Sequence, residues 1–115
     1  MKCFEREVLG YPIRAELRAL DDGYDVALFG GCRSHVGAVS FAEPDGSEQT
    51  MIRGSHKEAF ITRPWAQRLA KAWNAPVCVR AGVHYDEATK EQIETILQAC
   101  DGLLEEVIKN IPDHD

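Results

Sequence analysis

Short strand patterns joined by hairpin-type turns occupy the first half of the sequence, and they restrict the fold more than any other feature. Residues 13–20 alternate between apolar and polar side chains, which is the period of a strand with one solvated face. Turn sequences follow at 21–23 (Asp-Asp-Gly) and at 44–47 (Pro-Asp-Gly-Ser). Strands are therefore predicted over 3–9, 12–20, 24–29, 35–41 and 49–52. Because hairpins place antiparallel strands side by side, we expect a mostly antiparallel sheet.

Two helices and one further strand are predicted in the second half. The first helix has two possible starts, a capping box over 55–58 or the sequence Thr62-Arg63-Pro64. We favour the second, with residues 55–61 as a turn or a short helical lead-in. A strand pattern covers 76–83. A capping box at 89–92 opens the second helix, whose apolar stripe continues to residue 111. This order predicts an α+β fold with a sheet of about five to six strands and both helices packed on one face.

Length and composition favour a single soluble domain spanning residues 1–115. The chain is 44% hydrophobic and 28% charged, as is ordinary for a globular protein. Its net charge of −6 disfavours a nucleic-acid-binding surface. It has neither a membrane-spanning apolar run nor an apolar leader after Met1, so we expect no membrane contact and a cytoplasmic location. The cysteines lack CxxC spacing, and we expect free thiols, with Cys78 and Cys100 in the core.

Glycine and histidine occur together at the boundaries of three predicted elements. The three turns are 30–37 (Gly-Gly-Cys-Arg-Ser-His-Val-Gly), 54–57 (Gly-Ser-His-Lys) and 82–86 (Gly-Val-His-Tyr-Asp). Glycine permits positive φ angles or the close approach of another group, and histidine titrates near neutral pH or binds metals. Taken alone, each histidine is better explained as a structural, hydrogen-bonded residue. Their shared context leads us to predict that the turns meet at one site.

Such a cluster contains the donor atoms of a metal site. His35, His56 and His84, together with Asp86, could bind zinc or iron. The sequence has no HxH or HExxH spacing, so this signal is weak.

The same turns could instead hold an anion. Glycine-rich backbone would supply N–H donors, and Arg33, Arg53 or Lys57 would add positive charge. No dinucleotide-binding or P-loop sequence is present, so a tight turn explains Gly30-Gly31 equally well. Arg80, inside a predicted strand, either faces solvent or is held by a carboxylate or an anionic ligand, and we favour solvent.

Together, the three turns resemble the LpdD-like prenylated-flavin chaperone domain, a small protein found beside UbiD-type decarboxylases such as gallate decarboxylase. The matching motifs occur in the family's order over roughly residues 8–110. They are Gly30-Gly31 with His35-Val36-Gly37-Ala38, then Gly54-Ser55-His56-Lys57, then Gly82-Val83-His84-Tyr85-Asp86 and a helix. A remoter likeness in architecture is to the small proteasome-assembly chaperones.

The resemblance implies a non-catalytic homodimer that binds prenylated FMN, or FMN, and delivers it to an apo UbiD-type decarboxylase. Arg33 and Lys57 would contact the phosphate, and the histidines would hydrogen-bond the edge of the ring. The implied cofactor-binding residues are Gly30, Gly31, Arg33, His35, Gly37, His56, Lys57, Gly82, His84 and Asp86. Two alternatives remain open. One is a small metal-dependent enzyme using His35, His56, His84 and Asp86, and the other is a protein-binding assembly chaperone without a small ligand.

Overall fold

Six strands form one sheet in the order β1-β2-β3-β6-β4-β5. The computed structural model describes residues 1–54 and 57–114, so Ser55, His56 and Asp115 lie outside the described residues. The elements are β1 (Lys2–Val8), β2 (Tyr11–Ala19), β3 (Tyr24–Gly31), β4 (Arg33–Ala42), β5 (Glu48–Ile52), α1 (Ala59–Trp73), β6 (Val77–His84) and α2 (Lys90–Ile108). Every strand pair is antiparallel except β3 with β6. The predicted α+β fold with a mostly antiparallel sheet is confirmed.

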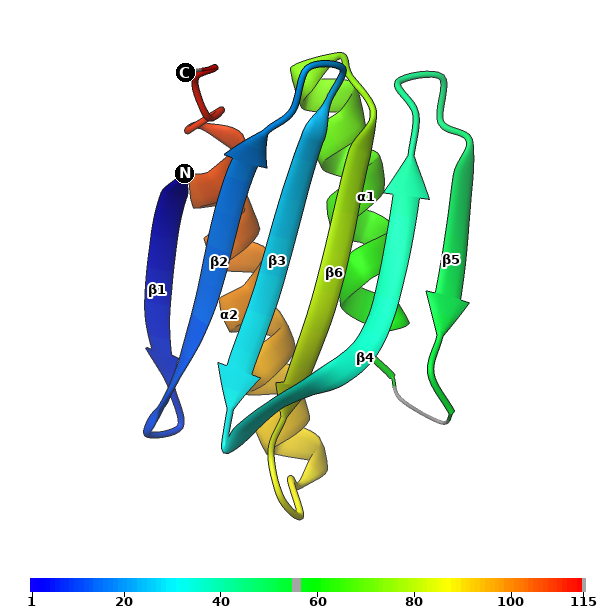
Figure 1. Cartoon of the computed structure of the whole chain (residues 1–115). Coiled ribbons are helices and arrows are strands. Elements are labelled where there is room, and N and C mark those ends of the chain that lie inside the picture. Colours follow the sequence, from blue (N-terminus) through cyan, green and yellow to red (C-terminus); the bar gives the residue numbers. More distant parts are fainter. Residues whose placement is uncertain (55–56, 115) are drawn as a thin grey trace.

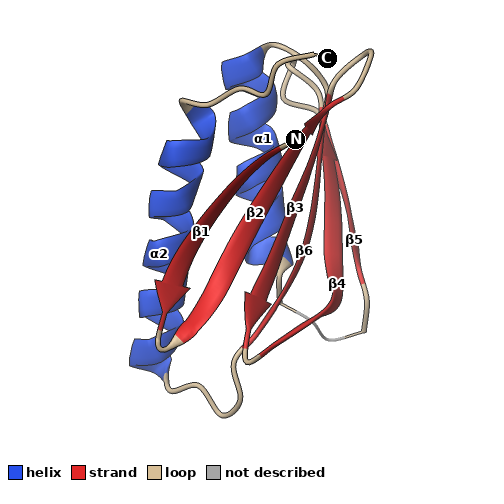
Figure 2. Cartoon of the chain, turned by 60° about the vertical axis from the view of Figure 1, so that its left-hand side comes forward, coloured by secondary structure: helices blue, strands red, loops and turns tan. Residues whose placement is uncertain are grey.

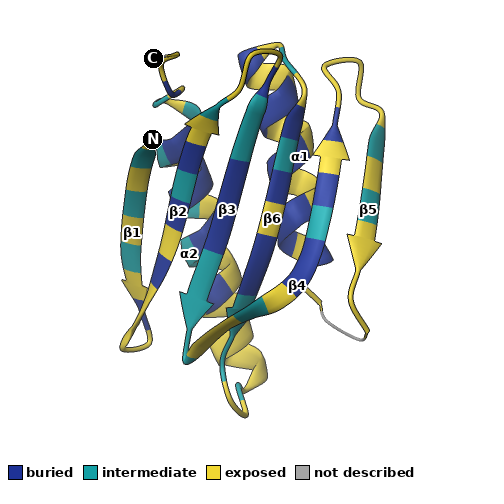
Figure 3. Cartoon of the chain, in the orientation of Figure 1, coloured by how far each residue is buried: buried dark blue, intermediate teal, exposed yellow. Residues whose placement is uncertain are grey.

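Both helices cover the same face of the sheet and leave the other face open (Figures 1 and 2). The period-two patterns decide which side chains meet the helices. In β2 the side chains of Ile13, Ala15 and Leu17 are buried, while the residues between them are wholly or partly exposed, an alternation visible in Figure 3. The core therefore lies between one face of the sheet and the two helices.

Helix α1 begins at Ala59, so the predicted start at Thr62 is wrong. The backbone N–H groups of Ile61 and Thr62 both donate to the carbonyl of Glu58, at 2.8 Å each, and close the first turn earlier. Pro64 consequently lies inside the helix, where it removes one backbone hydrogen bond. Burial of the apolar side chains on both sides of the proline holds the helix together, because tertiary packing outweighs local propensity.

Helix α2 begins as predicted, with Thr89 and Gln92 forming a reciprocal capping box. The part of its apolar stripe that is buried comprises Ile96, Cys100, Leu103, Leu104 and Val107. Burial raises the pKa of the Cys100 thiol to about 12, as suits a core cysteine. Within the described residues, neither helix combines the length and the apolarity that a bilayer crossing requires.

Two residues on the open face of the sheet, Cys78 and Arg80, bear on predictions made from the sequence. Cys78 was expected in the core, but it alternates with the buried Val77 and Val79 and is only partly buried. Arg80, also on this face, is half exposed and is bound through two nitrogens to the two carboxylate oxygens of Asp25, at 3.2 Å each. Both suggestions for Arg80, solvent and a carboxylate, therefore hold.

Candidate functional site

The first part of β4 crosses the end of β6 before it pairs with the outer edge of that strand (Figure 1). The turn between β3 and β4 is anchored by the backbone N–H of Cys32, which donates to the carbonyl of His84 at 2.8 Å. Ser34 pairs with Val83, whereas Ala38 pairs with Ala81, so four steps along β4 match two along β6. The surplus residues form a bulge, which bends a strand and interrupts its ladder.

Glycine at position 82 allows this crossing. A Cβ added there would overlap the carbonyl oxygen of His35, which is backbone and cannot swing aside. At Gly37 a Cβ would meet the carboxylate of Glu58 at 2.5 Å and the carbonyl of Ala81 at 2.7 Å. Two of the predicted site glycines are thus explained by close packing within the chain.

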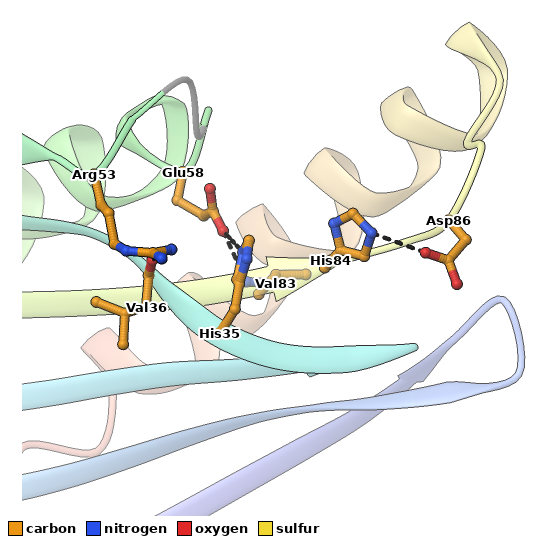
Figure 4. Close-up of polar contacts among 7 residues, drawn as sticks. All are labelled: His35, Val36, Arg53, Glu58, Val83, His84 and Asp86. Carbon is orange, nitrogen blue, oxygen red and sulfur yellow. Dashed lines mark hydrogen bonds and ion pairs between the residues drawn. The ribbon is translucent and has the colours of Figure 1, made fainter.

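The carboxylate of Glu58 fills the interruption in the ladder. Its Oε2 accepts a hydrogen bond from the backbone N–H of Val83 at 3.2 Å and pairs with Nε2 of His35 (Figure 4). The Glu58 residue is only 5% exposed, so these two partners replace water around a buried carboxylate. The sequence showed Glu58 only as the last residue of the rejected Ser55 capping box. Its contact at the bulge was missed because no local sequence pattern distinguishes a glutamate that caps a helix from one that binds a neighbouring strand.

A second histidine–carboxylate pair lies next to the first. Nε2 of His84 is 2.9 Å from Oδ1 of Asp86, and Nη2 of Arg33 donates to the same oxygen at 3.0 Å. The hydrogen bond with His84, followed by that from Arg33, holds the pKa of Asp86 below its usual range. The ring centroids of His35 and His84 are 5.5 Å apart. Two of the three predicted turns, those of His35 and His84, therefore meet.

The remaining predicted residues surround this cluster. Gly31, with φ of +86°, packs against the carbonyl of His84 and the ring of Tyr85. The hydroxyl of that tyrosine donates to the carbonyl of Val8 at 2.8 Å, and burial raises its pKa to about 12. Gly30 lies against the backbone of β2, and Lys57 is exposed immediately before Glu58. His56 falls outside the described residues, so its predicted contact is not placed.

An apolar hollow of about 540 Å³ lies on the open face, beside the bulge. The residues that line it are Phe29, Val36, Gly37, Ala38, Val39, Met51, Ile52, Arg53, Arg80 and Ala81. Of these residues, Gly37 belongs to the set that the family resemblance implies, and Arg53 was named as a possible source of positive charge for an anion. The backbone N–H of Arg53 donates to the carbonyl of Gly37 at 2.9 Å, so the chain directly after β5 is held against the bulge.

A metal centre finds no support in the described part of the chain. No group of three histidine, cysteine, aspartate or glutamate side chains in residues 1–54 and 57–114 is placed to hold a metal ion. What the arrangement offers is two histidine–carboxylate pairs, several cations and an apolar recess. These features define a small α+β protein with an apolar recess beside two histidine–carboxylate pairs.

Similar proteins agree with this class. Residues 7–112 match the family of the prenylated flavin chaperone LpdD-like domain. The chain is similar to Protein LpdD of Lactiplantibacillus plantarum, at 28% identity over 121 residues, 99% of this chain and 88% of that protein. It also resembles a chain from the crystal structure of a novel chaperone complex for yeast 20S proteasome assembly. That match has a TM-score of 0.58 and 15% identity and covers 96% of this chain and 98% of the other, which shows a shared fold alone.

The chain belongs to the family of prenylated flavin chaperone LpdD-like domains, because the family match covers nearly its whole length. The resemblance drawn from the three glycine–histidine turns is confirmed. The family is described as one of chaperones, which makes a non-catalytic protein the consistent class.

Proposed function

We propose that this protein binds prenylated FMN, shields it and delivers it to an apo UbiD-type decarboxylase. The observation that carries the proposal is the match to the prenylated flavin chaperone family over residues 7–112. A carrier must both hold and release its cargo, so we expect moderate affinity.

The residues at the crossing suit a planar ring bearing a phosphate. Arg33 and Lys57 supply positive charge for the phosphate, and charge-assisted bonds to phosphate are among the stronger polar contacts. His35 and His84 would hydrogen-bond the polar edge of the ring, because the carboxylates of Glu58 and Asp86 already hold both imidazoles in place. The chemical reactivity belongs to the flavin, and the residues of this chain would bind and orient the flavin.

The same proposal extends to the assembly and its surroundings. A flat flavin is enclosed more easily between two subunits than within 115 residues, so we propose a homodimer. Large apolar side chains are exposed on β4 and β5, with Phe41 at 57% and Met51 at 74%, and a second copy would cover them. We place this exchange of cargo in the cytoplasm, with the decarboxylase as partner.

Anaerobic mixing with prenylated FMN tests the proposal directly. Purified protein should retain the flavin through gel filtration and then restore activity to an apo UbiD-type decarboxylase. A His35→Ala/His84→Ala double variant should retain less of it. His114→Ala is the matched control, since this histidine contacts the carbonyl of Leu20 far from the crossing. Absence of retention by the wild-type protein would count against the proposal, and equal retention by the double variant would count against the assignment of the two histidines to the ring.

A further inference from the structure

Four strands align their side chains in one row across the open face. The register pairs Arg80 with Ala27 of β3 on one side and with Val39 of β4 on the other. Val39 in turn pairs with Met51 of β5. A cation therefore lies between a small residue and two apolar ones, at the centre of a sheet face that no helix covers (Figure 2).

The hollow beside this row has the size and lining of a small-molecule site. Its volume of about 540 Å³ lies inside the range of roughly 300–1,000 Å³ that is usual for ligand pockets. Phe29, Val36, Val39 and Met51 line it with apolar surface, and Val36 and Met51 are 71% and 74% exposed. Such side chains would be shielded from water by a flat aromatic molecule lying on them.

The guanidinium of Arg80 is held in place by a carboxylate. Asp25 bonds to it through both carboxylate oxygens, which fixes its plane without exhausting its donors. The Arg80 side chain remains 49% exposed, and exposed ion pairs of this kind contribute little to folding stability. Arg53 also lines the hollow, and its guanidinium donates to the carbonyl of Val36 at 3.4 Å. Two guanidinium groups at one recess of an acidic chain favour a ligand that is apolar over most of its surface and anionic at one point.

We infer that this hollow is the seat of the flavin, with the ring on Phe29, Val39 and Met51 and the phosphate on Arg80. The inference rests on the proposed function and deepens it. It moves the main binding surface from the histidine cluster to the open sheet face, and it assigns the phosphate to Arg80 in place of Arg33 and Lys57. Asp25 then becomes a positioning residue for Arg80. The histidine pair then borders the seat through Val36 and Gly37, which continue the chain from His35 into the hollow.

The test varies the phosphate and the arginine together. Prenylated FMN and its phosphatase-treated counterpart, which has the same ring without the phosphate, are titrated anaerobically into wild-type protein and Arg80→Gln. The wild type should bind the phosphorylated form at least about tenfold more tightly, as a charge-assisted contact implies. Arg80→Gln should lose that preference while binding the dephosphorylated form as the wild type does, a pattern that a folding defect would not produce.

Matched variants separate this site from general effects. Arg68→Gln is the control for charge, because Arg68 is also paired with a carboxylate, that of Glu105, and its side chain is 48% exposed. It should keep the full preference for phosphate. Met51→Asp should weaken both ligands about tenfold or more, whereas Phe60→Asp, at a residue 73% exposed on α1, should weaken neither.

Each outcome decides a different point. Flavin binding with no phosphate preference in the wild type, or with a preference that survives Arg80→Gln, would overturn this seat while leaving the carrier function intact. The seat would also be overturned if His35→Ala/His84→Ala bound neither ligand while Met51→Asp bound both fully. That result would place the flavin at the histidines. Failure of the wild type to bind either ligand would overturn the carrier function itself.

Discussion

Glu58 is the residue that joins three elements at the bulge. It precedes α1, accepts the N–H of Val83 in β6 and pairs with His35 in β4. A carboxylate that is 5% exposed is stable only while such partners remain, since its own desolvation is unfavourable. The pair therefore holds the crossing strand in place, and both proposed binding surfaces beside the bulge depend on it.

Replacing Glu58 with alanine should destabilise the protein by about 3 kcal/mol. The substitution leaves the N–H of Val83 without its acceptor and removes the carboxylate that pairs with the imidazole of His35. Urea unfolding followed by circular dichroism measures the change. The control is Glu105→Ala, which breaks an exposed ion pair with Arg68 and should cost less than about 1 kcal/mol. Equal effects of the two substitutions would show that Glu58 has no special structural function.

The acidity of Asp86 offers a second test at this scale. Its pKa lies below the ordinary value of 3.8, chiefly because of the hydrogen bond with His84. A lowered folded-state pKa means that the stabilisation is present above pH 3.8 and is lost as the pH falls through the folded value. Carbon-13 NMR of the carboxylate should show a midpoint below 3.8 in the wild type, moving upward in His84→Ala. An unmoved midpoint would contradict the assigned cause.

Among the elements, β4 is the one whose path could not be read from the sequence. The strand pattern at 35–41 predicted its core, and the turn glycines marked its start. The insertion of β6 between β3 and β4 depends on pairing between segments about 50 residues apart, which no local pattern encodes. The start of α1 at Ala59 was not predicted either. A proline usually marks the first turn of a helix, but here the burial of side chains around Pro64 outweighs that local signal.

Gly82→Ala should destabilise the protein by about 2–3 kcal/mol, because the new methyl group meets the carbonyl of His35 and displaces the crossing strand. Gly102→Ala is the matched control. Its Cβ would meet only the end of the flexible Arg6 side chain, and alanine is the better helix former, so the change should stay within about 1 kcal/mol. Thermal unfolding compares the two. Similar midpoints would mean that the crossing tolerates a side chain.

On the scale of the whole molecule, two helices cover one face of the sheet and leave an equally wide face open. The sequence indicated this architecture, because alternating strands and a single apolar stripe per helix allow only one buried layer. The three-turn motif also identified the family and brought His35 and His84 together. The hollow on the open face was missed because Phe29, Val39 and Met51 come from three strands, and their proximity follows from strand order rather than from any segment.

That open face links flavin binding to the proposed dimer. If two copies enclose the flavin between their open faces, bound flavin must favour the dimer by mass action. Sedimentation velocity should then show a species of twice 12.8 kDa whose dissociation constant falls about tenfold or more with prenylated FMN. Phe41→Glu places a charge on this face, outside the hollow, and should weaken both dimerisation and flavin binding. Phe60 on α1 is also an exposed phenylalanine, but the helix layer lies on the other side of the sheet. Phe60→Glu should therefore change neither dimerisation nor flavin binding. A flavin-loaded monomer would separate the two properties, leaving a carrier that encloses its cargo without a second copy.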